Sequence, residues 1–381
     1  WTVTTASATT LDSGTLQLPR IPAGSHRTVS LDLEKSKVTN ADDKCFIKLA
    51  FTLAEATTWA QAGHSVGATQ FAIPIPEQHR PSYNPVACTK GMDSLTCEED
   101  HRYVHASSGS ADWTFDKVQG TMASWSFNNV ELLQEGPRFQ IWRAPTDNDM
   151  VVAREWRKNH LHLFSERVKD VQWRQDDAES CRITVHSRAA PASLGFGYNL
   201  VYTYTIVNNG GITLQVQGEP DGDFPQYIPR IGLRTALPTS FRNVTWFGRG
   251  PGENYPDSQR AAVVDEYSRT VDDLFTPYVM PQEYGERMDV RRVACSDSRG
   301  NGIAIHGDPT FHFQASRYTA QDLDEAKHTC ELVPRDCVYL SLDAAISGIG
   351  CQSCGPPLAE HYRLKARPFN LRLHMSPLLM T

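Results

Sequence analysis

The sequence predicts a mainly β protein, because alternation of apolar and polar residues with a period of two dominates it and helical periodicity is scarce. The clearest example is residues 200–218, LVYTYTIVNNGGITLQVQG, in which alternate apolar side chains from Leu200 to Ile206 share one face of a strand. The NNGG run that follows tolerates the positive φ angles of a tight turn. Apolar alternation then resumes at Ile212. This segment therefore predicts a β-hairpin.

Further strands are predicted where short segments are rich in β-branched and aromatic residues. These segments are Trp113 to Phe115, Ala123 to Phe127, Arg182 to His186, Asn301 to His306, Thr310 to Ala315 and Val338 to Leu342. Helices are expected only at Val152 to Leu161 and at Ala320 to His328. Before the second of these, Thr319 and Asp322 have the spacing of a capping box.

The chain of 381 residues is long enough for two domains. Prolines, cysteines and clustered charges interrupt the alternation between residues 77 and 101, which we interpret as a linker. Residues 1–76 contain too few strand candidates for a closed sandwich, so we expect a domain that lacks its first strands. Residues 102–381 show no clear break and predict one very large sandwich.

Composition argues against two classes of partner. Acidic residues outnumber basic ones by 44 to 37, the net charge is −7, and there is no basic stripe that would follow nucleic-acid phosphates. The longest uncharged run, Ala56 to Pro76, is too polar for a membrane span. The sequence begins at Trp1 without an initiator methionine or a signal segment, and we expect it to be part of a longer protein.

Nine cysteines are scattered along the chain, a pattern that fits reduced thiols and a cytoplasmic location better than a disulfide framework. Cys351 and Cys354 have CxxC spacing, but a zinc site needs a second ligand pair, and Cys330 with Cys337 does not repeat that spacing. We favour loop thiols, or an incidental disulfide, over a zinc site.

Motifs for phosphate binding, metalloproteolysis and serine hydrolysis are missing from the sequence. It contains instead a series of strings that resemble the small-chain region of glycoside hydrolase family 2 β-galactosidases, in that family's order and at compatible spacing. They are ATTWAQAGH (56–64), FQIWRAPTDND (139–149), FGRGPGENYPD (247–257), TPYVMPQE (276–283), FQASRYTAQ (313–321) and LSLDAAISGIG (340–350).

The resemblance implies a partial immunoglobulin-like β-sandwich at 1–76 and a galactose-mutarotase-like β-supersandwich at 102–381. In that family the two catalytic glutamates, and the Mg²⁺ ligands beside the acid/base, lie on a TIM barrel that precedes this region, and this chain has no such β/α pattern. The expected partners are therefore that barrel, a galactoside substrate and further copies in a homo-oligomer. The whole enzyme is expected to use Mg²⁺ and Na⁺, with no cofactor and no catalytic residue in this chain.

Two places in the chain are candidates for lying beside the substrate. In WRAPTDND, Arg143 stands near Asp147, Asn148 and Asp149, and we favour a buried ion-pair network over substrate contact. The second place follows the GIG turn, where the family has a Trp that forms an aromatic platform for the sugar. This sequence is one residue shorter there, so that Cys354, followed by Gly355, falls at the position of the Trp. We favour a structural role also for the turn-rich GRGPGENYPD string.

Two other functions remain open. The supersandwich fold is shared with aldose epimerases, which need a general acid and a general base. His306, His312, Glu253 and Glu283 are the residues that could be nominated. A carbohydrate-binding module is the second alternative, with Trp142, Trp156 or Trp246 stacking on a sugar, although we expect these three to be buried.

Overall fold

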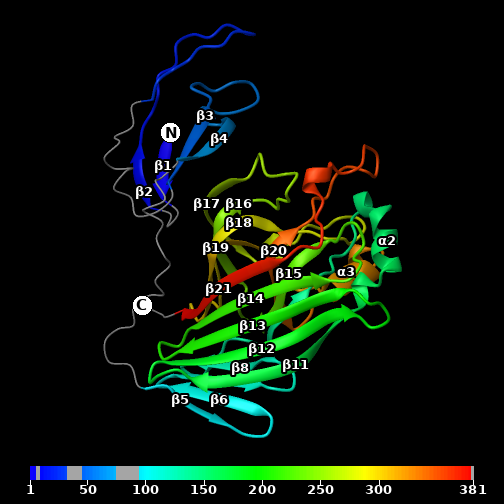
Figure 1. Ribbon diagram of the computed structural model, residues 1–381. Helices are drawn as coiled ribbons and strands as arrows, with labels where there is room; N and C mark the ends of the chain where they lie inside the picture. The colour runs from blue at the N-terminus through cyan, green and yellow to red at the C-terminus, as the bar shows by residue number, and fades with distance from the viewer. Residues whose placement is uncertain (6–8, 32–44, 74–93, 379–381) are drawn as a thin grey trace. The chain divides into compact units, whose positions relative to one another are not determined.

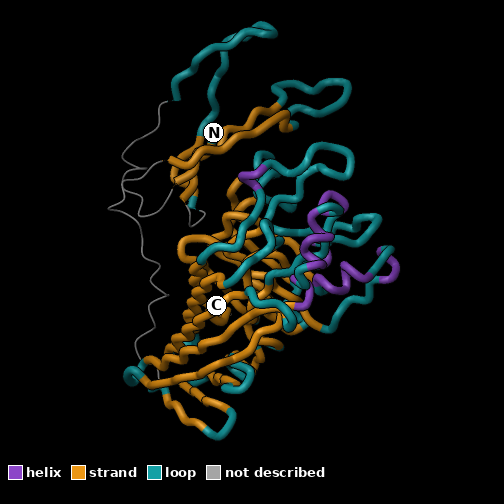
Figure 2. Tube along the Cα trace, turned by 45° about the vertical axis from the view of Figure 1, so that its right-hand side comes forward, coloured by secondary structure: helices purple, strands orange, loops and turns teal. Residues whose placement is uncertain are grey.

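The computed structural model describes residues 1–5, 9–31, 45–73 and 94–378. Strands make up most of the trace and the helices are few and short, as Figure 2 shows, which confirms a mainly β fold. The chain divides into two compact units, the first containing Trp1–Asn84 with Val263–Glu266 and the second containing the remainder. Among the described residues, no helix is long and apolar enough to cross a membrane.

The first unit is a four-stranded antiparallel sheet with the strand order β2-β1-β3-β4. Its strands are β1 (Thr2–Thr5), β2 (Thr10–Ser13), β3 (Cys45–Thr52) and β4 (Ser65–Ile73). The described part of this unit has a small core, in which Val3 and Cys45 are fully buried. The few strands that the sequence predicts for this region are therefore present as one sheet.

The second unit is built on a twelve-stranded antiparallel sheet, whose long strands lie side by side in Figure 1. Its main path is β10-β15-β20-β19-β21-β14-β13-β12-β11, and β16, β17 and β18 branch from it. The bounds are β10 (Glu135–Gln140), β11 (Phe164–Gln175), β12 (Ser180–Pro191), β13 (Gly197–Val207), β14 (Ile212–Asp221), β15 (Arg230–Pro238), β16 (Asn243–Gly250), β17 (Val263–Thr270), β18 (Arg287–Ser296), β19 (Gly302–Ser316), β20 (Cys337–Ile346) and β21 (Phe369–Leu378).

A five-stranded sheet packs against this large sheet and closes the core of the second unit. Its strands are β5 (Thr96–Glu99), β6 (Tyr103–Ser108), β7 (Ala111–Asp116), β8 (Thr121–Phe127) and β9 (Val130–Glu131). The rings of Phe115 and Tyr204 meet edge to face across the two sheets, with centroids 5.2 Å apart. Trp125 Nε1 donates to the carbonyl of Gly210 at 3.1 Å, which joins β8 to the turn of the predicted hairpin.

The predicted hairpin is confirmed, because β13 pairs with β14 and the last pair before the turn is Ile206 with Ile212. Leu200, Tyr202, Tyr204 and Ile206 are all buried, as their alternation predicts. The predicted segments 301–306 and 310–315 belong to one long strand, β19. Residues 96–99, which we assigned to the linker, form β5 and pair with β6, while residues 74–93 of that region lie outside the described residues.

Helices occur near both predicted positions but are shorter than expected. They are α2 (Val152–Lys158) and α3 (Ala320–Glu325), with 3-10 turns at η2 (Asp147–Asp149), η3 (Leu161–Leu163), η4 (Asp272–Leu274), η5 (Thr329–Glu331) and η6 (Glu360–Tyr362). The capping box at Thr319 and Asp322 is present, with Asp322 N donating to Thr319 Oγ1 at 3.0 Å.

The strand order places several of the family strings next to one another. β10, β15, β20 and β19 are consecutive neighbours, and their register aligns Gln140, Gly232, Asp343 and His312 in one row across the sheet. Segments that are up to 203 residues apart in sequence therefore contribute side chains to one place, which is the candidate site described next.

Candidate functional site

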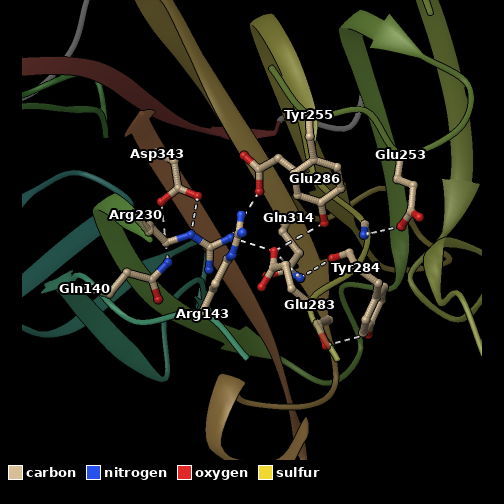
Figure 3. Close-up of polar contacts among 12 residues, drawn as sticks. Gln140, Arg143, Arg230, Glu253, Tyr255, Glu283, Tyr284, Glu286, Gln314 and Asp343 are labelled. Carbon is tan, nitrogen blue, oxygen red and sulfur yellow. Dashed lines mark hydrogen bonds and ion pairs between the residues drawn. The ribbon is translucent and has the colours of Figure 1, made fainter. Parts of the chain in front are cut away.

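A buried cluster of charged groups lies where these strands meet the loops before β18, and Figure 3 shows it. Arg230, the first residue of β15, is at its centre and is 1% exposed. Its Nη2 donates to Glu283 Oε1 at 2.9 Å and to Glu286 Oε2 at 3.2 Å. Its Nε lies 2.8 Å from Asp343 Oδ2. We call Arg230, Glu283, Glu286 and Asp343 the carboxylate cluster.

The Arg230 guanidinium faces three buried carboxyl groups, and burial raises the pKa of all three. Burial raises the pKa of Asp343 to about 7, although Arg230 opposes this shift. Burial, together with Asp343, also raises the pKa of Glu286 well above its usual value. Burial thus makes both acids hold a proton more strongly than an exposed carboxyl group does.

The backbone of β15 leaves space for this carboxyl group at one position. Gly232 lies opposite Asp343 in the register of β15 with β20. A Cβ atom at residue 232 would be 1.8 Å from Asp343 Oδ1. The third residue of the row, Gln140, places its Nε2 atom 3.5 Å from the same oxygen. Glycine is therefore required at 232 by the close approach of a buried side chain.

Polar groups from the loop after β16 and from β19 complete the environment of the cluster. Tyr255 Oη donates to Glu283 Oε1 at 3.4 Å, and burial raises the pKa of Tyr255 well above its usual value. Gln314 donates from Nε2 to the carbonyl of Tyr284. Gly285 N donates to Glu253 Oε2 at 2.7 Å. The cluster thus joins the loop after β16 to the loop before β18 (Figure 3).

A second buried ion pair lies beside this cluster and contains Arg143. Its Nη2 donates to both carboxylate oxygens of Asp149, at 2.9 and 3.0 Å. Its Nη1 donates to the carbonyl of Ser347 at 2.6 Å and its Nη2 to that of Gly348 at 3.0 Å. The favoured interpretation of Arg143 and Asp149 as a buried ion pair is confirmed. Asp147 takes a different partner, because its backbone N donates to Gln282 Oε1 at 3.1 Å.

Residues 348–356 begin at a carbonyl that Arg143 binds and then reach the surface. We call this segment the rim loop. Two other family strings hold this loop in place. Asp257 accepts from Ile349 N at 3.0 Å and from Gly350 N at 2.7 Å. Asn148 Nδ2 donates to the carbonyl of Gly350 at 2.8 Å, and Asn148 Oδ1 accepts from Ser353 N at 2.9 Å. The rim loop is therefore fixed at both ends of its turn.

The structure thus brings together five of the six residues named as substrate-adjacent. Arg143, Asn148 and Asp149 form the support of the rim loop, while Cys354 and Gly355 are exposed on it. The sixth, Asp147, is exposed beside Gln282. Cys354 is exposed, whereas contact of any of the six with a substrate stays a prediction.

The residues nominated for other functions have structural partners. Glu283 belongs to the carboxylate cluster, and Glu253 accepts from Thr276 Oγ1 at 3.2 Å as well as from Gly285. His312 Nδ1 accepts from Asp289 N at 3.2 Å. Burial lowers the pKa of both His306 and His312 to about 4, so neither ring is protonated at neutral pH.

The three nominated tryptophans are buried, as expected, with Trp142 at 8%, Trp156 at 1% and Trp246 at 0% exposure. Trp156 Nε1 donates to the carbonyl of Tyr227 at 3.1 Å. Trp246 Nε1 donates to the carbonyl of Arg249 at 3.1 Å. Their rings belong to the core of the second unit rather than to an open sugar-binding surface.

Sequence reasoning missed Arg230, Glu286, Asp343 and Asp257 as parts of this site. One signal could have found two of them: Arg230 and Asp343 are charged residues within otherwise apolar strand segments, IPRIGL and LSLDAAI. A charge in such a segment must have a buried partner. Within the described parts of the chain, no group of three or more His, Cys, Asp or Glu side chains is placed to hold a metal ion.

The sequence matches two family models. One, described as the β-galactosidase small chain, matches residues 107–375, and the other, described as β-galactosidase domain 4, matches residues 1–74. Curated relatives named β-galactosidase from Actinobacillus pleuropneumoniae and Photobacterium profundum are each 30% identical, over 92% and 94% of this chain. The chain spans about a third of the length of these relatives, 34% and 35% respectively.

Similarity to solved structures is weak in sequence and in geometry. A GalM/aldose epimerase homologue from C. elegans matches with a TM-score of 0.40 and 9% identity, over 76% of this chain and 100% of that one. A galactose 1-epimerase from Lactobacillus acidophilus matches with a TM-score of 0.39 and 8% identity, over 76% and 99%. Similarity at this level does not carry an activity from one protein to another.

Proposed function

This chain belongs to the β-galactosidase small-chain family, and we propose that it serves as the non-catalytic C-terminal part of a glycosidase that hydrolyses terminal β-D-galactosides. In this role it supports an active site formed by another part of the same enzyme and contributes to assembly of the oligomer. The observation that carries the proposal is the rim loop, which residues from two other family strings hold at the surface of the second unit.

The construction of the rim loop fits a supporting role. Arg143 and Asp149 are buried below the loop and hold the carbonyls where it begins. Asn148 and Asp257 then fix the backbone of its turn. A segment fixed by so many buried and half-buried groups presents its exposed atoms at defined positions, which is what a neighbouring active site requires of a supporting loop.

The exposed residues around the loop favour a large protein surface as its neighbour. Met150 and Val151 are 59% and 61% exposed and follow directly after Asp149. Val279 and Met280 are 90% and 52% exposed, and they belong to the segment that Gln282 links to Asp147. We propose that the TIM barrel of the whole enzyme covers these apolar side chains and faces the rim loop.

The chemistry itself is assigned to that barrel. The carboxylate cluster of this chain is fully buried, so its acids cannot reach a sugar. We propose that the two catalytic glutamates, and the ligands of Mg²⁺ and Na⁺, belong to the barrel, that the whole enzyme is a cytoplasmic homo-oligomer, and that Asp147 and Asn148 lie closest to the substrate. An aldose epimerase or a free-standing carbohydrate-binding module gains no specific support from the nominated residues.

Hydrolysis of a chromogenic β-galactoside by four samples tests this proposal. This chain alone should show no turnover, and the full-length enzyme should be active. Asn148→Ala in the full-length enzyme should lower kcat/KM by about tenfold or more, since a displacement of ~1 Å in a positioning segment can cost ~100-fold. Asn370→Ala, which removes an exposed asparagine from β21, is the matched control and should retain activity.

Either of two results would contradict the proposal. One is turnover by this chain alone that survives removal of contaminating enzyme. The other is an equal loss of activity in the Asn148 and Asn370 variants, because the rim loop would then have no special role.

A further inference from the structure

The rim loop carries two exposed thiols, on Cys351 and Cys354. Among the cysteines that the structure describes, Cys45, Cys181, Cys295 and Cys337 are buried and Cys97 is half-buried, which limits their reaction with dissolved reagents. Cys330 is exposed, but it lies in η5, a different segment of the chain. Cys351 and Cys354 are therefore two accessible thiols that are only three residues apart.

The backbone between the two cysteines forms a closed turn. Cys354 N donates to the carbonyl of Cys351 at 3.2 Å, and Gly355 N donates to the same carbonyl at 2.7 Å. Residues three apart across a turn have Cα atoms less than about 7 Å apart. A disulfide requires a Cα separation of about 4.4 to 6.8 Å. The turn therefore holds the two cysteines near the separation at which a disulfide can form.

The sulfur of Cys351 is directed across this turn rather than away from it. Its Sγ lies 3.7 Å from the carbonyl oxygen of Pro356, to which the thiol donates. A Cβ atom added at Gly355 would be 2.8 Å from the same sulfur. Because Gly355 has no side chain, the Cys351 sulfur has room next to the residue that follows Cys354.

The turn is held in this form before any oxidation occurs. Asn148 Oδ1 accepts from both the backbone N and the hydroxyl of Ser353, at 2.9 and 2.7 Å, and Asp257 holds the amide of Gly350. A fixed turn raises the effective concentration of one thiol near the other, because little conformational freedom is lost when they join. An intramolecular disulfide is therefore favoured over two separate adducts.

We propose that Cys351 and Cys354 form a reversible thiol–disulfide site on the rim loop, which reacts with small disulfide oxidants such as glutathione disulfide. One thiolate attacks the oxidant, forms a mixed disulfide and releases the first glutathione. The second thiolate then attacks the protein sulfur of that mixed disulfide, forms the Cys351–Cys354 bond and releases the second glutathione. The two cysteines lose two electrons and two protons, and the oxidant receives them as two thiols.

Peptide mapping by mass spectrometry after incubation with glutathione disulfide tests this site, and it needs only this chain. In the wild-type protein, the peptide with both cysteines should lose the mass of two hydrogens without gaining glutathione, and dithiothreitol should reverse the change. In Cys351→Ser and in Cys354→Ser, the remaining cysteine should instead keep a glutathione adduct. Cys330→Ser is the control and should leave the wild-type result at 351 and 354 unchanged.

Three results would overturn the proposal: stable glutathione adducts on both Cys351 and Cys354 in the wild-type chain, no reaction at either residue, or formation of a disulfide only between Cys97 and Cys181. The last pair is the relevant competitor because interaction with the Cys181 thiol lowers the pKa of Cys97. Circular dichroism of each serine variant distinguishes loss of the site from loss of the fold. Failure of this site would leave the proposed glycosidase role untouched.

Discussion

Gly232 shows how one residue determines whether the carboxylate cluster can exist. Its position on β15 faces Asp343 on β20, whose side chain is completely buried. Any Cβ at 232 would overlap Asp343 Oδ1 and displace the carboxyl group from Arg230. The carboxyl group has no solvent to move into, so the strain would remain within the core.

Gly232→Ala should therefore destabilise the protein by about 2 kcal/mol or more, since overpacking costs ~1–3 kcal/mol and disturbance of a buried ion pair adds to it. Urea denaturation followed by tryptophan fluorescence measures the change. Gly195→Ala is the matched control, because a Cβ there meets nothing within 4 Å. Equal destabilisation by the two variants would show that the overlap with Asp343 has no importance.

The raised pKa of Asp343 predicts how stability depends on pH. In the folded protein, burial raises the pKa of Asp343 to about 7, whereas an exposed Asp in the unfolded chain has a pKa of about 3.9. The folded state thus binds a proton that the unfolded state has released, and the contribution of this group to stability falls as the pH rises from about 4 to about 7. Asp343→Asn, which resembles the protonated form, should flatten the decline in stability between pH 5 and pH 8.

The melting temperature of the wild-type and Asp343→Asn proteins across that pH range measures the effect. Burial lowers the pKa of His306 and His312 to about 4, so these groups contribute stability that is lost as the pH falls below their unfolded value near 6.5. They act in the opposite direction and are present in both proteins, so they cancel in the comparison. Asp112→Asn, on the exposed side of β7, controls for the loss of an aspartate. Parallel curves for wild type and Asp343→Asn would contradict the assignment of the proton.

At the scale of elements, alternation in the sequence was sufficient to predict the hairpin of β13 and β14, because local periodicity determines which face of a strand is buried. It could not predict that β15 lies between β10 and β20, since pairing between distant strands depends on the whole fold. The carboxylate cluster arises from this pairing. For that reason Arg230, Glu286 and Asp343 were not nominated, although two of the family strings contain Glu283 and Asp343.

The structure predicts that the hydrogen exchange of the rim loop depends on a single side chain, that of Asp257. Asp257 accepts from two consecutive amides, Ile349 N and Gly350 N, and a Cβ at Gly348 would be 2.7 Å from its Oδ1. Asp257→Ala should expose these amides and increase their hydrogen exchange by roughly tenfold, since a charge-assisted hydrogen bond contributes ~1.5–3 kcal/mol.

Hydrogen exchange of the peptide that spans 348–356, measured by mass spectrometry, tests this expectation. Peptides from β13 should keep their wild-type exchange, which shows that the rest of the second unit is intact. Asp273→Ala is a suitable control, because its carboxylate bonds only to Thr270 in an exposed turn. Unchanged exchange at 348–356 in Asp257→Ala would mean that other contacts hold the loop.

At the scale of the whole molecule, the two compact units differ in the size of their cores. The described core of the first unit contains Val3 and Cys45 with a few partly buried neighbours. The core of the second unit extends between two sheets and includes four fully buried tryptophans, Trp113, Trp125, Trp156 and Trp246. Burial of apolar surface is the main stabilising contribution, so the first unit should open much more readily.

Hydrogen exchange of the intact chain should therefore show amides of β1 and β3 exchanging at least about tenfold faster than those of β13 and β14, a difference of ~1.4 kcal/mol in opening free energy. The comparison uses paired strands in both units, so that hydrogen-bonded amides are compared with each other. Equal protection in the two units would mean that they unfold as one cooperative body.

The role of the rim loop in the whole enzyme leads to a prediction about substrate affinity. Cys354 is exposed, and we propose that it takes the position of the family's aromatic platform, which would leave the proposed active site without a ring that stacks on the sugar. Cys354→Trp in the full-length enzyme should therefore lower KM for galactosides, by up to roughly tenfold for ~1 kcal/mol of stacking, and should change kcat less. Gln352→Trp, which places the same ring elsewhere on the turn, is the matched control. Steady-state kinetics with a chromogenic galactoside compares KM of the two variants and the wild type. A lower KM for Cys354→Trp alone would support the aromatic platform. Equal KM values in all three proteins would refute it.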